Sequence, residues 1–232
     1  MNLFAKFNET FIVTGYYKMM LEGFKNTVII TLGALLIGLF IGTLISIVKY
    51  SSEEVKGLRP FAFVGNLYVT VIRGIPMTVL LLLFYYIILK SADGILVAII
   101  CFGVNSGAYM AELIRSGINA VDKGQMEAAR SLGLSRLQAM RHVVLPQAVR
   151  YILPAIGNEM IALLKETSVA GYVAVVDLTR AGNLVRNNTY DAVTTLVLVA
   201  LVYLTLVVGL TKMIEGLEKK LARGTVRKKG RK

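Results

Sequence analysis

Few side chains in this sequence have the type and spacing that covalent chemistry needs. The 232 residues include one histidine, His142, and one cysteine, Cys101. Metal sites built from several histidines are therefore excluded. A Ser-His-Asp triad would have to use His142, which lies beside Arg141 in a polar stretch. No G-x-x-x-x-G-K-[ST] phosphate loop occurs either, so we expect neither ATP hydrolysis nor another enzyme activity in this chain.

A second group of polar side chains lies inside apolar stretches. Asn105, Tyr109 and Glu112 are spaced i, i+4 and i+7, which places them on one face of a helix. Glu159 and Glu166 are also seven residues apart. A charge at mid-bilayer costs about 2.5–3.5 kcal/mol on insertion scales, so such residues usually face a partner or an aqueous path. The two stripes indicate a lined pathway; the alternative is that these carboxylates sit at helix ends or pair across helices.

The longest polar stretch between apolar runs covers residues 118–150. Asp122 can begin a helix there, since an acidic residue favours a helix N-terminus. Gly133 can end it, because glycine accepts the left-handed conformation that closes helices. Ser135 can cap a second helix, from Arg136 to about residue 144, which we expect to stop before Pro146.

Two short helices that turn at Gly133 would form a compact knob. We expect Met126, Ala129 and Leu132 to mark the apolar side of its first helix. Small side chains at Ala128 and Ala129, beside Glu127, would be exposed and would suit docking into a groove on another protein. A generic charged loop would need neither the paired alanines nor the turn glycine.

The elements that must position these residues are membrane helices. The chain is 56% hydrophobic with a mean hydropathy of +0.66, and a span needs roughly 20 mostly apolar residues. We predict an all-α integral membrane protein with about five spans, near residues 27–48, 61–89, 95–116, 151–170 and 192–211. Residues 1–25 would lie at the interface and 216–232 would form a basic tail. We expect 61–89 to be one helix bent or broken at Gly74–Pro76; two short helices are the alternative.

The positions of the basic residues give the orientation. The net charge is +12, but Lys and Arg flank apolar runs and no aromatic-interleaved basic face appears, which argues against nucleic-acid binding. Eighteen of the 26 Lys and Arg residues fall in the 49–59 loop, the 115–150 stretch and the tail from 212. Five spans with the N-terminus outside and the C-terminus inside place all three segments in the cytoplasm, provided that 61–89 crosses once.

Several motifs in order resemble those of one family. Glu127-Ala128-Ala129, Gly133 and Val143-x-Leu145-Pro146 resemble the EAA loop of ABC importer permeases. Three further segments resemble the branch that transports polar amino acids, although isoleucine and glutamate stand where that branch has threonine and aspartate. They are Arg73-Gly74-Ile75-Pro76, Ala108-Tyr109-Met110-Ala111-Glu112 with Arg115-x-Gly117, and Leu164-Lys165-Glu166-Thr167-Ser168.

The resemblance implies a type I ABC importer fold in a bacterial plasma (inner) membrane. It implies an ATPase dimer that holds ATP and Mg²⁺, a second permease subunit, identical or related, an extracytoplasmic solute-binding protein and an amino-acid substrate. This chain would hold no metal or cofactor itself. The expected ATPase-coupling residues are Glu127, Ala128, Ala129, Gly133, Leu145 and Pro146. The candidate substrate contacts are Asn105, Ser106, Glu159, Glu166 and Thr167.

Two other functions fit part of the pattern. A stand-alone secondary carrier or channel could use the same intramembrane carboxylates as proton or ion sites, but the spans show no pair of similar halves. A membrane scaffold could use the polar stretch only to recruit a cytoplasmic partner. The missing phosphate loop favours the importer, because its ATP hydrolysis belongs to another chain.

Overall fold

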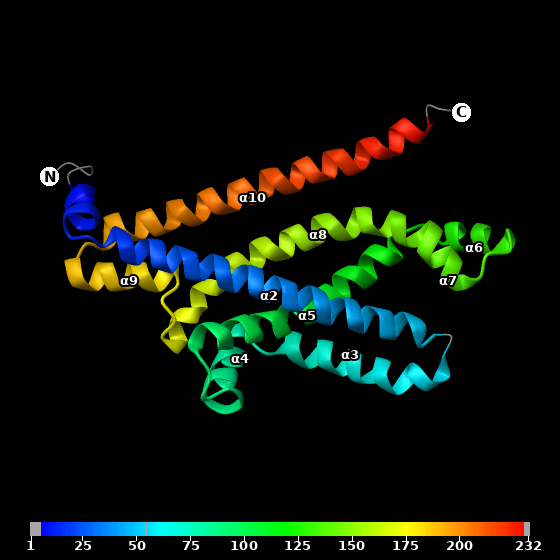
Figure 1. The fold of residues 1–232 in the computed structure, drawn as a ribbon, viewed down its shortest axis with the longest axis horizontal. Helices are drawn as coiled ribbons and strands as arrows, with labels where there is room; N and C mark the ends of the chain where they lie inside the picture. Colours follow the sequence, from blue (N-terminus) through cyan, green and yellow to red (C-terminus); the bar gives the residue numbers. More distant parts are fainter. Residues whose placement is uncertain (1–5, 54, 230–232) are drawn as a thin grey trace.

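A computed structural model describes residues 6–53 and 55–229, and every regular element in those ranges is helical. Figure 1 shows a long bundle in which α2 runs along the molecule. Helix α10 also runs along it, on the other side of α8 from α2. The helices are α2 (Tyr17–Ser51), α3 (Arg59–Gly74), α4 (Met77–Leu83), α5 (Gly94–Asn119), α6 (Lys123–Ser131), α7 (Arg136–Ala139), α8 (Leu145–Glu166), α9 (Leu178–Thr189) and α10 (Ala192–Lys229). Shorter helical turns are η1 (Asn8–Val13), η2 (Lys56–Leu58), η3 (Phe84–Ile88), η4 (Met140–Val144) and η5 (Thr167–Val173).

Three helices in the described ranges are long and apolar enough to cross a membrane: α2, α5 and the part of α10 up to Leu221. The 22-residue α8 does not reach the same hydropathy, since it carries Glu159, Lys165 and Glu166. Large apolar side chains are exposed along the outer faces of α2, α3 and α10, as expected where a surface meets lipid. The first long helix begins at Tyr17, ten residues before the predicted span, and so includes part of the predicted interfacial segment. Residues 1–5 of that segment and 230–232 of the predicted tail lie outside the described residues.

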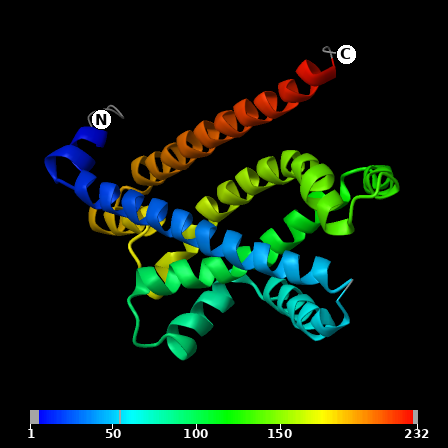
Figure 2. The ribbon, with the colours of Figure 1, turned by 45° about the vertical axis from the view of Figure 1, so that its right-hand side comes forward.

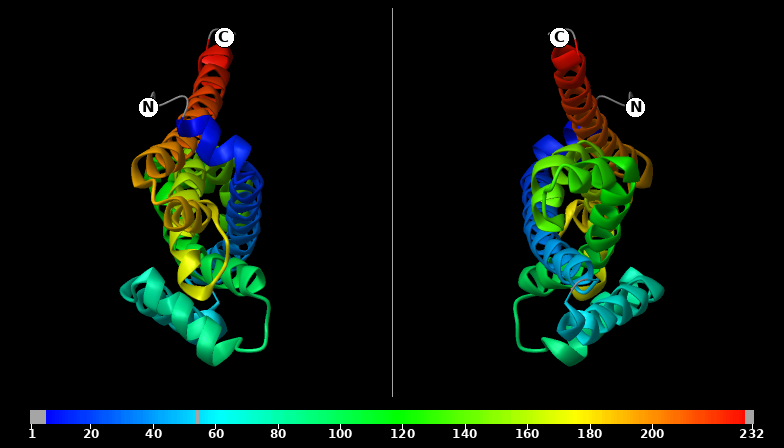
Figure 3. Two further views of the ribbon diagram at one scale, coloured as in Figure 1. Left: turned by 90° about the vertical axis from the view of Figure 1, so that its left-hand side faces the viewer. Right: turned by 90° about the vertical axis from the view of Figure 1, so that its right-hand side faces the viewer.

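The predicted break in residues 61–89 falls where the sequence places it, and its geometry is that of two helices. Helices α3 and α4, with their flanking turns, are bent by 108°. Ile75 and Pro76 both have extended backbone, with ψ of 129° and 137°. A residue before proline is driven out of the helical region, so two consecutive extended residues swing α4 away from α3. Figure 3 shows the resulting arm projecting from one side of the bundle.

Helices α2 and α5 pack against each other more extensively than any other pair of helices in the described residues. A Cβ atom on Gly42 would lie 2.4 Å from Cβ of Met110, and one on Gly38 would lie 2.8 Å from Cβ of Ser106. The Ser46 hydroxyl also donates to the Ala111 carbonyl at 3.2 Å. Small residues allow such close backbone approach where lipid offers no hydrophobic drive. The two helices therefore form one rigid pair.

Candidate functional site

The polar stretch folds into two helices that project from the bundle. Asp122 is the N-cap of α6, and its carboxylate accepts from the Gly124 N–H at 2.7 Å. Gly133 has φ of +87°; its N–H bonds the Arg130 carbonyl and the Leu134 N–H bonds the Ala129 carbonyl, which together close α6. Helix α7 begins with the capping box of Ser135 and Gln138. The predicted beginning and end of α6 and the predicted cap of α7 are therefore confirmed.

The predicted end of the second helix is wrong. The chain continues from α7 through the π-helical turn η4 into α8, where Pro146 occupies the first turn. Proline is tolerated there because its missing N–H would have no helical partner in a first turn. In η4 the Leu145 N–H bonds the carbonyl of Met140, five residues back, so the hydrogen-bond register shifts just before the proline. Leu145 and Pro146 are both exposed.

The exposed face of the knob differs from the predicted one. Ala128 and Glu127 are exposed, as expected, but Ala129 is only 3% exposed because it faces η4 and α7 across the turn. Leu132 was expected on the apolar side and is instead 83% exposed. Leu137 is 71% exposed, and sequence reasoning missed it. In the sequence, leucines on either side of the turn at Gly133, in an otherwise polar stretch, are the pattern that could have indicated an apolar tip.

A polar contact between α5 and α8 lies at the centre of the predicted pathway. The Ser106 hydroxyl donates a hydrogen bond of 2.9 Å to Oε1 of Glu159. Ser106 is fully buried and Glu159 is half-buried. Glu166, also half-buried, is close enough to Glu159 for their charges to interact. Of the five predicted substrate contacts, these three therefore gather around one place.

The remaining two predicted contacts are engaged elsewhere or enclosed. The Thr167 hydroxyl is fully buried and donates to the Leu164 carbonyl at 2.8 Å, at the end of α8. Asn105 is 5% exposed within α5. Glu112 fits the alternative in which the carboxylates form ion pairs. It pairs with Arg115 at 2.7 Å and with Lys49 at 3.5 Å.

Arg73, in the last turn of α3, contacts the same face of α5. Its guanidinium carbon lies 4.9 Å from the ring centroid of Tyr109, within the range of a cation–π contact. Tyr109 follows Ser106 by three residues on α5, so both share one helix face about one turn apart. One face of α5 thus contacts a cation of α3 through Tyr109 and a carboxylate of α8 through Ser106, about one helical turn apart.

The fold and the site together define a class of protein. Apolar helices with an internal polar face and a protruding polar knob are the arrangement of a membrane permease that works with a partner protein. The family model described as "Binding-protein-dependent transport system inner membrane component" matches residues 55–223. The chain belongs to this family.

Known proteins resemble the chain over most of its length. It is 34% identical over 208 residues to the probable glutamine ABC transporter permease GlnM of Bacillus subtilis, covering 88% of this chain and 94% of that protein. It is 35% identical over 206 residues to the arginine transport system permease ArtQ of the same organism, covering 87% and 92%.

Solved structures share the fold. A chain of an amino acid ABC transporter, crystallised with histidines, superposes with a TM-score of 0.82 at 35% identity, covering 90% of this chain and 96% of that one. A chain of the MetNI methionine ABC transporter in an inward-facing conformation gives 0.74 at 21% identity, covering 88% and 96%, which shows the shared fold alone. The chain therefore has the type I ABC importer transmembrane fold.

Proposed function

We propose that this chain forms the translocation pathway of an ATP-driven importer of amino acids in a bacterial plasma (inner) membrane. A second permease subunit, identical or related, would complete the pathway. A separate ATPase dimer would bind ATP and Mg²⁺, and an extracytoplasmic solute-binding protein would deliver the substrate. Family membership and the amino-acid transporters among its relatives support this proposal.

The observation that carries the coupling role is the exposed apolar tip of the knob. Leu132 and Leu137 are large, apolar and mostly exposed, next to the small Ala128, Glu127 and the turn at Gly133. These leucines are not buried within this chain. Binding of a partner protein that covers them would be stabilised by about 25 cal/mol per Å² of apolar surface buried. The ATPase subunit is the partner proposed for this surface, with Ala129, Leu145 and Pro146 supporting the knob from behind or beside it.

The test is to replace both tip leucines with glutamine. The double variant Leu132→Gln, Leu137→Gln should insert normally but lose co-purification of the ATPase subunit and at least about tenfold in ATPase stimulation by the loaded binding protein, because two apolar anchors are worth about 1.4 kcal/mol or more. Leu21→Gln is the matched control, since Leu21 is also exposed but lies near the start of α2. Normal stimulation by the double variant would contradict the coupling role.

For the substrate, the same proposal assigns the site to the region around Glu159. A free amino acid carries an ammonium and a carboxylate, and Glu159 and Arg73 offer the opposite charges on one side of α5. Ser106 would orient the Glu159 carboxylate, and Glu166 would add negative charge for a cationic side chain. Asn105 and Thr167 would support the site from within the bundle.

A further inference from the structure

Arg136 joins the knob to the C-terminal end of α2. This helix is distant from the knob in the sequence. Its Nε donates to the Tyr50 hydroxyl at 3.2 Å, and its Nη2 bonds Oε2 of Glu53. The guanidinium carbon also lies 5.0 Å from the centroid of the Tyr50 ring. The side chain of Arg136, in the first turn of α7, therefore makes two contacts with Tyr50 of α2 and one with Glu53, which follows α2.

The electrostatic setting of Arg136 agrees with this geometry. The Tyr50 hydroxyl and then the Glu53 carboxylate raise the pKa of Arg136 above its usual range. The side chains of Arg136 and Glu53 are 31% and 60% exposed. A pair this exposed contributes about 0–1 kcal/mol to stability. The contact is thus poorly explained as a stabilising device.

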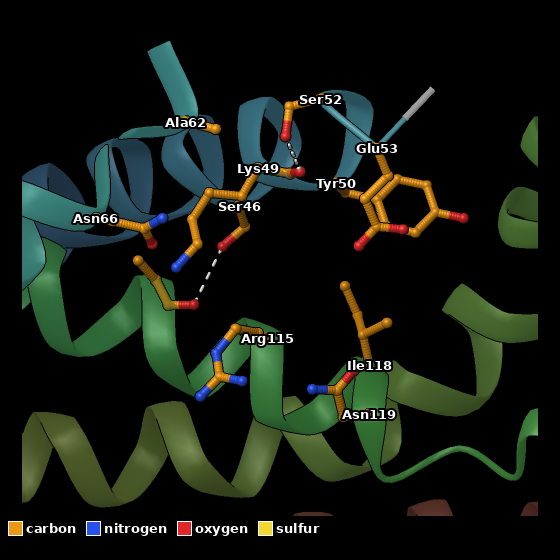
Figure 4. Close-up of a pocket in the computed structure, with 11 residues that line it drawn as sticks. Ser46, Lys49, Tyr50, Ser52, Glu53, Ala62, Asn66, Arg115, Ile118 and Asn119 are labelled. Carbon is orange, nitrogen blue, oxygen red and sulfur yellow. Dashed lines mark hydrogen bonds between the residues drawn. The ribbon is translucent and has the colours of Figure 1, made fainter. Parts of the chain in front are cut away.

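The surroundings of the contact leave the knob room to move. A groove of about 560 Å³ separates the end of α2 from the knob, lined by Tyr50, Val121, Met126, Arg136 and Met140 among others. On the other side of Tyr50 and Glu53, a cavity of about 260 Å³ separates α2 from α3 and α5. Figure 4 shows Tyr50 and Glu53 next to each other at the end of α2, with Ile118 and Asn119 of α5 opposite. The knob is therefore bridged to the end of α2 across a groove, whereas on its other side it packs against α5 and α8 in one apolar cluster.

Helix α2 can carry a displacement to the predicted pathway. It forms a rigid pair with α5 through the close approaches at Gly38 and Gly42. Helix α5 holds Ser106, whose hydroxyl bonds Glu159 on α8. The chain already links the knob to α5 through residues 120–122 and to α8 through η4, and Met126 and Met140 belong to an apolar cluster with Ile118 of α5. The contacts of Arg136 add an attachment to α2, so that the knob is held to both helices of the α2–α5 pair.

We propose that Arg136 is a positioning residue that tethers the knob to α2, so that a movement of the docked knob turns the α2–α5 pair instead of being absorbed in the groove. This rests on the proposed function. It predicts that loss of the tether leaves docking and ATP hydrolysis intact while less substrate is moved per ATP. Coupling free energies between protein sites are typically about 1–3 kcal/mol, so we expect about a tenfold loss in that yield.

The experiment uses the complete importer in vesicles and measures substrate uptake and ATP hydrolysis together. Arg136→Gln should lower uptake per ATP about tenfold, and Tyr50→Phe, which loses the hydroxyl but keeps the ring, should lower it less. Arg141→Gln is the matched control, because Arg141 is an exposed arginine on the same knob. The charge exchange Arg136→Glu with Glu53→Arg re-forms the ion pair and should recover most of the yield. A merely structural role would lower the amount of assembled importer and would leave its uptake per ATP unchanged.

The outcomes separate this proposal from the proposed function. Absence of ATPase co-purification and stimulation in the unsubstituted importer would overturn the proposed function itself. An unsubstituted importer that couples, together with an unchanged yield in Arg136→Gln, would overturn the tether. Loss of ATPase co-purification in Arg136→Gln would overturn it too, because Arg136 would then be a docking residue. Failure of the charge exchange to raise the yield above that of Arg136→Glu alone would have the same consequence.

Discussion

At the scale of single residues, the pathway differs from a set of isolated intramembrane charges. Glu159 accepts the Ser106 hydroxyl through Oε1 and lies within the influence of both Arg73 and Glu166. The guanidinium group of Arg73 lies over the ring of Tyr109. The partner of Glu159 is a neutral hydroxyl, whereas the carboxylate of Glu112 is engaged in an ion pair with Arg115.

The first prediction concerns this carboxylate. Glu159→Gln keeps the size of the side chain and can still bond Ser106, but it removes the charge that would pair with a substrate ammonium group. We expect uptake at saturating loaded binding protein to fall about tenfold, equivalent to about 1.4 kcal/mol. Glu215→Gln, at an exposed glutamate of α10, is the control and should transport normally. Equal uptake by the two variants would remove Glu159 from the substrate site.

The residue scale also shows where sequence reasoning ends. Seven-residue spacing correctly places Glu159 and Glu166 on one face, because helix periodicity is local. The pairing of Ser106 with Glu159 joins residues 53 positions apart, and no local pattern specifies that contact. Arg73 could be recognised as a charge inside an apolar window, but only the packing of α3 against α5 brings it over Tyr109.

At the scale of elements, the knob was the most predictable part of the chain. Caps and turns depend on single residues, so Asp122, Gly133 and Ser135 each predict a local structure that the fold contains. The errors are tertiary in origin. Ala129 is buried by a helix that follows it in the chain, and Pro146 is accommodated by a π-helical turn that sequence alone does not reveal.

The second prediction tests the α2–α5 pair. Gly42→Ala places a methyl group 2.4 Å from Cβ of Met110 and 2.8 Å from the Ala111 nitrogen, so one helix must shift. We expect a loss of about 1–3 kcal/mol of stability. Cys101 provides the readout, since it is the sole cysteine and is buried, so its reaction with a thiol-specific dye on heating reports unfolding.

The control for this substitution is another helical glycine. Gly209 of α10 has nothing within 4 Å of an added Cβ, so Gly209→Ala should leave the unfolding temperature unchanged or raise it slightly through helix propensity. If Gly42→Ala unfolds no earlier than Gly209→Ala, the close pairing of α2 and α5 is wrong, and the route proposed from Arg136 through α2 loses its basis.

At the scale of the whole molecule, the basic segments gather at one end. Figures 1 and 2 show the α2–α3 connection, the knob and the C-terminal end of α10 toward one end of the bundle, with α9 and the described N-terminal residues toward the other. The sequence predicts this separation from charge alone, since the three basic segments lie on the same side of any five-span topology. The number of crossings is less evident, because α8 is too polar to be recognised by hydropathy and the bent α3–α4 pair fits either a broken span or a re-entrant loop.

The third prediction decides that topology by labelling. Single cysteines placed at Ser91 and Asn188, in a Cys101→Ser background, should react with an impermeant thiol reagent added to intact cells, because both positions are exposed and belong to the predicted outer side. A cysteine at Ser131, exposed in the knob, should react only after the membrane is opened. If the α3–α4 pair were re-entrant, the Ser91 position would lie on the side of the 49–59 loop and would be protected in intact cells. Helix α5 would then carry the knob to the outer side, where no ATPase could reach it, so labelling at Ser131 in intact cells would contradict both the five-span topology and the proposed coupling.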